Sequence, residues 1–490
     1  MEKTLPKPTG IDHATDPIYL EAGRYGTDDM LPKWGPLATF GYNLEAISTS
    51  VESMSFLYPK IVPPIYAREI SEKANLKVIN PQRIRELEHL TGHDVIATQR
   101  ALEEVVSKEA SPYIGLATTS ADITETGKAK QIKESIAIAV DSLENLRDVT
   151  LEKSIEWINI PHMDQTHMID AFPTVLGRPF SYYSEMLQSD LDFWSYVYRN
   201  SVKAKWSDAT GNYHSLNALG IDAFKVENEY CKRMGISHNK DSEQVPDHMI
   251  ASAQIPGREF IADVAYAFSR TAETMNNMAQ YMALDKGDDI NIFTDTHPKK
   301  RKGSSAMPHK DIKGGNPTIE EQTESFANAT RGTMTTMLSS CKMRYARDLT
   351  ASATDRIELP KIFRWGDYVI RRLSDAVFYL GANEERCKER IDRTFGTTTS
   401  SRVLTYLTDS EKTSNPMPRS KTHDLLGELA TKAYTEKISF TDVLLNNEEI
   451  KSHLSMDDII EASNPKTFIG ESKEIVQKVF NSFHNKKTLV

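Results

Sequence analysis

The sequence predicts an all-α fold, and three observations support this prediction. Two long segments, residues 128–158 and 258–284, contain no proline or glycine, and each carries apolar residues at helical spacing. Both segments exceed the average globular helix of about 11–12 residues. Alternating strand-like patterns are scarce along the chain. Because long helices with a continuous apolar stripe pack as bundles, we expect a helical bundle at the centre of the molecule.

The chain divides into three predicted helical domains. Residues 1–111 contain segments broken by proline and glycine, which indicate short helices. Residues 112–362 contain both long segments and most of the motifs discussed below, so this block is expected to form the central bundle. Residues 363–490 contain shorter helical segments with polar joints such as TDSEKTSNPMPRS. The methionines of the second long segment, Met275, Met278 and Met282, are expected to pack in the core.

Composition and charge exclude several classes of protein. The chain has 490 residues, a net charge of -10 and a pI of about 5.8, whereas general nucleic-acid binding needs a basic surface. Its three cysteines form no disulfide framework or zinc spacing. The N-terminus has no apolar core like that of a signal peptide, and no stretch is apolar for long enough to span a bilayer. We therefore expect a soluble, cytoplasmic protein that binds neither nucleic acid nor membrane.

The most informative motif is a flexible, cationic loop at residues 303–317, GSSAMPHKDIKGGNP. Glycines at both ends give the backbone conformational freedom, so its amide groups can turn toward an anion. Lys310 can then bind the negative charge of that anion. Pro317 suits the first turn of a following helix, TIEEQTESFANATRG. Such a loop can bind a carboxylate beside a helix N-terminus, although composition alone also fits a plain spacer.

The order of residues in this loop resembles the fumarase/aspartase superfamily, whose members eliminate fumarate from succinyl compounds. The resemblance implies that Ser304 is the catalytic base, with Ser305 as the alternative. Lys310 and Asn316 would stabilise the developing charge, and Met307 would contact substrate. Most members close the motif with K-x-N-P, whereas here DIKGG separates Lys310 from Asn316.

Two further segments match the superfamily as a whole. The run QTHMIDAFPTVLG, residues 165–177, follows a helix-like stretch and carries the T-H pair, which implies that His167 is the general acid. Without the resemblance, His167 would be taken for a structural histidine. The run LATTSADITETG implies that Thr119 and Ser120 bind a substrate carboxylate at a helix start, with Asp122 expected at the N-cap. His162 and His167 do not form an H-E-x-x-H zinc motif, so no metal site is expected.

Other motifs are similar to those of the adenylosuccinate lyase family. They are RYGTDDMLPKW, TGHDVIA, SEQVP and ARDLTASATDR. Arginine forms two parallel charged hydrogen bonds with phosphate, which suits a nucleotide substrate. Each arginine taken alone would be read as a surface charge. The resemblance implies substrate contacts from eight residues: Arg24, Tyr25, His93, Asp94, Gln244, Arg347, Ser352 and Arg356.

The basic run PKKRKG, residues 298–303, has two interpretations. It can be a nuclear-import or nucleic-acid patch. We favour a loop flank that attracts an anionic substrate, because an acidic chain needs local cations there.

The family resemblance spans residues 24–470 and implies a complete function. It implies β-elimination of fumarate from adenylosuccinate, giving AMP, and from the related succinyl-carboxamide ribonucleotide of purine synthesis. It implies no metal or organic cofactor, and a homotetramer with shared active sites. Two alternatives stay open: another fumarate-releasing lyase, of the argininosuccinate lyase or carboxymuconate cycloisomerase type, and an inactive helical homologue.

Overall fold

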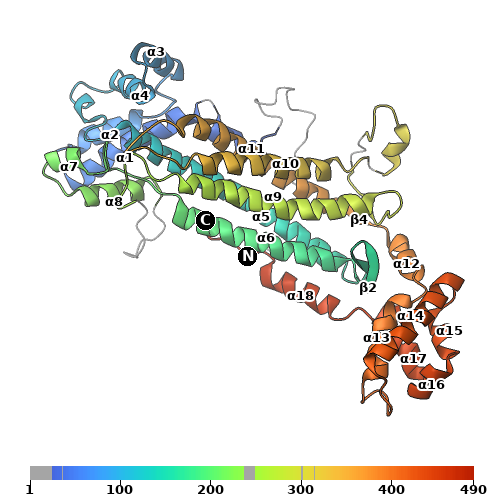
Figure 1. Ribbon diagram of the computed structural model, residues 1–490. Helices are drawn as coiled ribbons and strands as arrows, with labels where there is room; N and C mark the ends of the chain where they lie inside the picture. Colours follow the sequence, from blue (N-terminus) through green and yellow to red (C-terminus); the bar gives the residue numbers. More distant parts are fainter. Residues whose placement is uncertain (1–24, 36, 237–248, 299–301, 314) are drawn as a thin grey trace.

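The computed structural model describes residues 25–35, 37–236, 249–298, 302–313 and 315–490. Helices dominate it, which confirms the predicted all-α class (Figure 1). None of the helices in these ranges is long and apolar enough to cross a membrane. Five long helices form the central bundle: α5 (Ser120–Glu156), α6 (Gly177–Tyr196), α9 (Glu259–Lys286), α10 (Thr318–Ser339) and α11 (Ser352–Phe378).

The bundle helices have a defined direction. Glu125 and Arg258 pair near the starts of α5 and α9, and Lys128 of α5 pairs with Asp355 of α11, so these three helices run parallel. Lys286 at the end of α9 pairs with Glu320 at the start of α10, so α10 runs back along α9. The bundle therefore has one end with the starts of α5, α9 and α11, and another with the start of α10.

The predicted apolar stripes form the bundle core. Met275, Met278 and Met282 are fully buried on α9, as expected for core packing. The stripe on α5 is buried from Ile132 to Leu146. Ile158 was included in the predicted stripe but lies beyond α5, because the chain leaves the helix after Glu156 to enter a strand.

The N-terminal helices pack at one end of the bundle (Figure 1). They are α1 (Ala38–Leu57), α2 (Pro64–Lys73), α3 (Pro81–Thr91) and α4 (Asp94–Glu103), with α7 (His214–Ala218) and α8 (Ala223–Arg233) beside them. The expectation of short helices is wrong for α1, which has 20 residues. Burial of Leu44, Ile47 and Val51 holds α1 together despite Gly41.

Five C-terminal helices form a small unit with its own core: α13 (Ser400–Thr408), α14 (Arg419–Glu436), α15 (Phe440–Leu445), α16 (Glu448–His453) and α17 (Met456–Ala462). Helix α12 (Glu384–Asp392) precedes this unit, and α18 (Ser472–Phe483) follows it. The separate core begins at Val403 and ends at Ala462. The domain boundary expected between residues 362 and 363 falls inside α11, whose buried face continues into the main core. Helix α18 returns to pack along α5 and α6 (Figure 1).

Within the described ranges, four short strands form two antiparallel pairs at the far end of the bundle, and the first pair is a hairpin. They are β1 (Pro161–Thr166) with β2 (Ile169–Val175), and β3 (Phe293–Asp295) with β4 (Leu380–Ala382). The interpretation of the segment around His167 as the end of a helix-like run is wrong. His167 and Met168 have φ values of 54° and 64°, which a right-handed helix does not allow, and they form a two-residue hairpin turn.

Candidate functional site

The start of α5 is capped by Thr119. Its backbone N–H donates to the Asp122 carboxylate at 2.8 Å, and Asp122 occupies the third helical position. Asp122 is therefore not the N-cap that the sequence suggested. The Asp122 side chain is fully buried and pairs with Lys205, so it is a structural anion beneath the helix start. Thr119 and Ser120 remain partly exposed at the surface.

Four of the predicted substrate-binding residues meet at this end of the bundle. Ser120 Oγ lies 3.3 Å from His93 Nε2. His93 caps α4, and the adjacent Asp94 lies 3.5 Å from the Arg356 guanidinium. Arg356 comes from the first turns of α11 and its side chain is 74% exposed. Three chain segments that are distant in sequence thus form one polar surface with an exposed cation.

A buried charge cluster supports this surface from below. Glu125 accepts from Arg258 at 2.5 Å and from Lys128 at 3.2 Å, and Asp355 accepts from Lys128 at 3.0 Å. Burial alone would raise the pKa of Glu125, but the two cations outweigh it and the net pKa is lowered. These ion pairs hold the starts of α5, α9 and α11 in register.

The remaining predicted nucleotide contacts are less closely grouped. Ser352 starts α11, and Arg347 lies in the preceding loop, so both share the end of the bundle that carries Arg356. Tyr25 packs edge-on against Tyr368, with 5.5 Å between ring centroids, in the middle of α11. Arg24 and Gln244 lie outside the described residues.

The serine loop is folded back on itself at the opposite end. Ser304 Oγ accepts from the backbone N–H groups of Ala306 at 3.2 Å and Met307 at 3.1 Å. Lys310 Nζ donates to Asn316 Oδ1 at 2.9 Å, and the Asn316 amide donates to the Gly303 carbonyl at 3.1 Å. Despite the DIKGG insertion, Asn316 therefore lies against Lys310.

Asp311, within the insertion, closes the base of this loop. Its carboxylate accepts from the Gly303 N–H at 2.7 Å and from Lys302 Nζ at 2.8 Å. The Lys302 partner helps lower the pKa of Asp311. A Cβ atom on Gly303 would meet the backbone of Lys310 at 2.8 Å, so only glycine fits there. Met307, which also belongs to this loop, is 41% exposed.

His167 stands exposed at the tip of the β1–β2 hairpin. Left-handed backbone at a residue other than glycine costs about 1 kcal/mol and is frequent at functional sites. Across the hairpin, Asp170 accepts from Gln165 at 3.0 Å and pairs with Arg390 at 3.2 Å and Arg393 at 2.9 Å. These two arginines belong to the end of α12, so the hairpin is anchored to that helix.

The predicted site residues therefore lie at the two opposite ends of the helical bundle. Helix α5 has 37 residues and spans about 55 Å between Ser120 and the segment leading to the His167 hairpin. Helix α10 has 22 residues and separates the serine loop from Arg347 by about 33 Å. His167 and Ser304 both lie at the second end (Figure 1). Within a single chain, the residues at the two ends of the bundle do not share one cleft.

Sequence reasoning missed several residues that shape these regions. The sequence assigns no role to Asp170, and Asp311 stands out only as part of the DIKGG insertion. Nothing in the sequence links Asp170 to Arg390, because 220 residues separate them. In the described ranges, no group of three or more His, Cys, Asp or Glu side chains gathers as a metal site.

Comparisons with known proteins identify the class. Residues 67–332 match the family model described as lyase, and residues 396–479 match that of the adenylosuccinate lyase C-terminus. The first match spans more than half of the chain, so the chain belongs to the lyase family. Its branch is that of the adenylosuccinate lyases, since the second match is to their C-terminal segment and curated relatives across most of the chain carry that name.

Similar proteins cover nearly the whole chain. The adenylosuccinate lyase of Methanocaldococcus jannaschii is 28% identical over 465 residues, 95% of this chain and 96% of the relative. That of Streptococcus mutans is 27% identical over 458 residues, 93% and 98% of the two chains. A crystal structure of a fumarate lyase from Mesorhizobium sp. BNC1 has a TM-score of 0.79 at 17% identity, covering 95% of this chain and 100% of that one. The structural likeness shows the shared fold.

Proposed function

We propose that the protein cleaves adenylosuccinate to AMP and fumarate, and the related succinyl-aminoimidazole-carboxamide ribonucleotide to its carboxamide product and fumarate. The observation that carries this proposal is the adenylosuccinate lyase C-terminal match, together with curated adenylosuccinate lyases that align with 93–95% of the chain. The reaction is a β-elimination. A C–H proton is removed beside a carboxylate, a C–C double bond forms, and the C–N bond breaks as its electron pair moves to nitrogen.

Ser304 is the proposed base. A serine hydroxyl is a weak base, so its alkoxide must be stabilised. The two backbone N–H groups that donate to Ser304 Oγ favour the deprotonated form, because hydrogen bonds to a charged form stabilise it. Lys310 and Asn316 hold each other in place and would stabilise the dianion that develops on the substrate carboxylate.

His167 is the proposed acid. Its exposed position at a hairpin tip lets the ring reach a substrate held by other elements. An imidazole titrates near neutrality, so it can donate the proton that the departing nitrogen requires. Asp170 would keep the hairpin in place by its pairs with α12.

The surface at the start of α5 is the proposed substrate-binding region. Thr119 and Ser120 would hold one carboxylate, and Arg356 is an exposed fork for phosphate. The other proposed contacts are His93, Asp94, Tyr25, Arg24, Gln244, Arg347, Ser352 and Met307. Binding energy from this region would position the reacting carbon at a base supplied elsewhere.

We infer that the active site is completed by assembly into a homotetramer. The separation of Ser120 from the His167 hairpin by about 55 Å along α5 supports this inference, because the proposed substrate is far shorter. In the tetramer, the Ser120 end of the bundle in one chain would lie next to the His167 end of the bundle in a neighbouring chain. We also propose a cytoplasmic location, which the odd and sparse cysteine count of three supports.

The test is a Ser304→Ala substitution. We expect turnover of adenylosuccinate to fall by about 10²–10⁴-fold with KM little changed, since the variant loses the proton acceptor and keeps the binding surface. Fumarate release is the measurement. Ser305→Ala is the matched control and should keep most of the activity. Turnover of Ser304→Ala at the unsubstituted rate would remove Ser304 from the mechanism, and failure of the unsubstituted protein to release fumarate would overturn the proposed function.

A further inference from the structure

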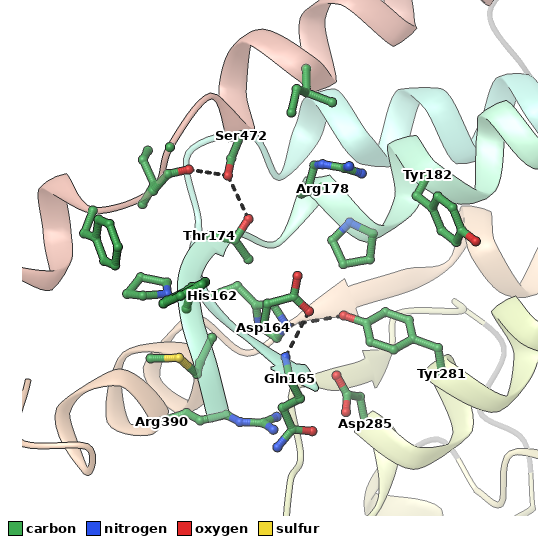
Figure 2. A pocket seen from close by; sticks show the side chains of 18 of the residues that line it. His162, Asp164, Gln165, Thr174, Arg178, Tyr182, Tyr281, Asp285, Arg390 and Ser472 are labelled. Atoms are coloured by element: carbon green, nitrogen blue, oxygen red, sulfur yellow. Dashed lines mark hydrogen bonds between the residues drawn. The ribbon is translucent and has the colours of Figure 1, made fainter. Parts of the chain in front are cut away.

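A large cavity lies beneath the His167 hairpin and has no part in the proposed chemistry. It has a volume of about 870 Å³ and lies between the hairpin, the start of α6, the end of α9 and the start of α18 (Figure 2). Its lining includes neither His167 nor any residue of the serine loop. Its volume is within the range of about 300–1,000 Å³ usual for small-molecule sites.

Two buried polar side chains in this cavity each have one atom without a hydrogen-bond partner. Asp285 is 5% exposed and its Oδ2 has no hydrogen-bond partner. His162 is 2% exposed and its Nδ1 has none, while its Nε2 lies 3.4 Å from the Tyr281 hydroxyl. Unpaired buried polar atoms are rare because each costs about 1–3 kcal/mol. The unpaired carboxylate oxygen can only be satisfied by a donor that enters the cavity.

The walls around Asp285 are aromatic. The rings of Tyr183 and Tyr281 lie 5.9 Å apart at 43°, and Tyr182 lies 5.6 Å from Tyr183. Figure 2 shows Tyr281 next to Asp285, with Asp164 on the facing strand. Burial, together with the charges of Tyr182, Asp285 and Asp164, raises the pKa of Tyr183 to about 12. This part of the cavity therefore carries negative potential.

Two arginines, Arg178 and Arg390, also line the cavity. Arg390 is bonded through Nε to Asp170 at 3.2 Å and makes no hydrogen bond to Asp285, although its charge lowers the pKa of that carboxyl. Burial nevertheless keeps the pKa of Asp285 raised, to about 6. Arg178 lies on α6, where its guanidinium is 3.5 Å from Ser181. A carboxylate oxygen without a hydrogen-bond partner, beside two tyrosine rings, forms an arrangement that attracts ammonium groups.

We propose that this cavity binds a small organic cation, a primary amine whose ammonium group lies between Tyr183 and Tyr281 and donates to Asp285. The ammonium supplies the missing donor and is held by ring faces as well as by charge. Asp164 and Gln165, which line the same cavity, belong to the hairpin that carries His167, so the occupant contacts that element.

The test is calorimetric titration of the full-length, assembled protein with 1,4-diaminobutane. The matched neutral probe is 1,4-butanediol, which has the same length and no charge. We expect the diamine to bind, and the diol to bind at least about tenfold more weakly because it lacks the charge. Binding of the diamine should persist with AMP and fumarate present, since the cavity lies apart from the proposed active site.

Substitutions then locate the bound amine. Asp285→Asn keeps the side-chain shape and should lower diamine affinity at least about tenfold, and Tyr183→Leu should also weaken it. Asp424→Asn removes an equal charge from a side chain 83% exposed on α14 and should leave affinity unchanged. Circular dichroism establishes that each variant is folded. Absence of binding at millimolar diamine, equal binding of the diol, loss of binding with AMP and fumarate, or undiminished binding in both folded variants would overturn the proposal.

Discussion

At the scale of single residues, Asp170 shows how much one side chain can contribute without touching substrate. It follows His167 by three residues and joins the hairpin to α12 through Arg390 and Arg393. The sequence motif around His167 assigns no role to it. Its partners lie about 220 residues further along, and residue spacing carries no information about such contacts.

Substitution of Asp170 by asparagine should reduce turnover more than binding. The variant keeps the side-chain shape and loses both ion pairs to α12, so the hairpin and His167 are less well fixed. We expect kcat to fall by about tenfold or more with KM within about twofold, because small displacements of a catalytic group are costly. Steady-state kinetics of fumarate release measure both constants.

Two results would contradict this role for Asp170. One is an unchanged kcat in the Asp170→Asn variant. The other is an equal rise in KM and fall in kcat for both Asp170→Asn and Asp170→Glu, which would indicate general loss of structure, since glutamate retains the charge that reaches the arginines.

His162 should make stability depend on pH. Burial, aided by Arg390, lowers its pKa from 6.5 to about 3 in the folded state. The unfolded chain therefore binds a proton below pH 6.5 that the folded chain does not, so stability is lost as pH falls from 6.5 toward 3. At full extent the effect is on the order of 5 kcal/mol, at about 1.4 kcal/mol per pKa unit.

The His162 effect is measured as a difference between variants, because Asp285 titrates with opposite sign in an overlapping range. Its pKa is raised to about 6, so its ionisation destabilises the fold as pH rises from about 4 to 6. We expect the melting temperature of His162→Gln to fall less steeply between pH 6.5 and 4 than that of the unsubstituted protein. His423→Gln, at a side chain 71% exposed, is the control. Parallel pH curves for all three proteins would contradict the assignment.

At the scale of elements, the long helices could be predicted from the sequence, but the short β1–β2 hairpin could not. Apolar spacing located α5 and α9 because their stripes are buried over many turns. The β1–β2 hairpin was missed because its turn is His-Met, whereas hairpin turns of this type usually contain asparagine and glycine. Tertiary contacts with α12 hold it in place.

The serine loop offers a test at this scale. Gly303→Ala places a methyl group 2.8 Å from the Lys310 backbone, so the loop must open and Ser304 must move. We expect kcat to fall by about tenfold or more, measured by fumarate release. Gly332→Ala on α10 is the matched control, because a Cβ there meets nothing within 4 Å and should raise stability by about 0.5–1 kcal/mol. Full activity in Gly303→Ala would show that catalysis does not need the folded-back conformation of the serine loop.

At the scale of the whole molecule, the family resemblance identified candidate site residues that lie at opposite ends of the bundle in a single chain. The resemblance assigns these residues to one proposed site, but their order along the sequence does not show how far apart they lie. The length of α5 and the antiparallel course of α10 determine that separation. The domain boundary near residue 362 was misplaced for a related reason: α11 continues through it without a change in composition.

Mixing two inactive variants tests whether the site is shared between chains. Arg356→Ala and Ser304→Ala alter opposite ends of the bundle. If each site takes its ends from different chains, hybrid oligomers contain some sites with both residues intact. We therefore expect co-refolded variants to release fumarate, whereas separately refolded ones do not. Absence of activity in hybrids that form correctly sized oligomers would place both residues in one chain's site.

The anchoring of the hairpin to α12 has a consequence for how variation in this protein is understood. The placement of His167, the proposed proton donor, depends on a helix that leads directly into the small C-terminal unit. Inherited or engineered changes within α12 can therefore slow the reaction while leaving every substrate contact intact. A map of harmful substitutions should show a second concentration there, remote from the chemistry.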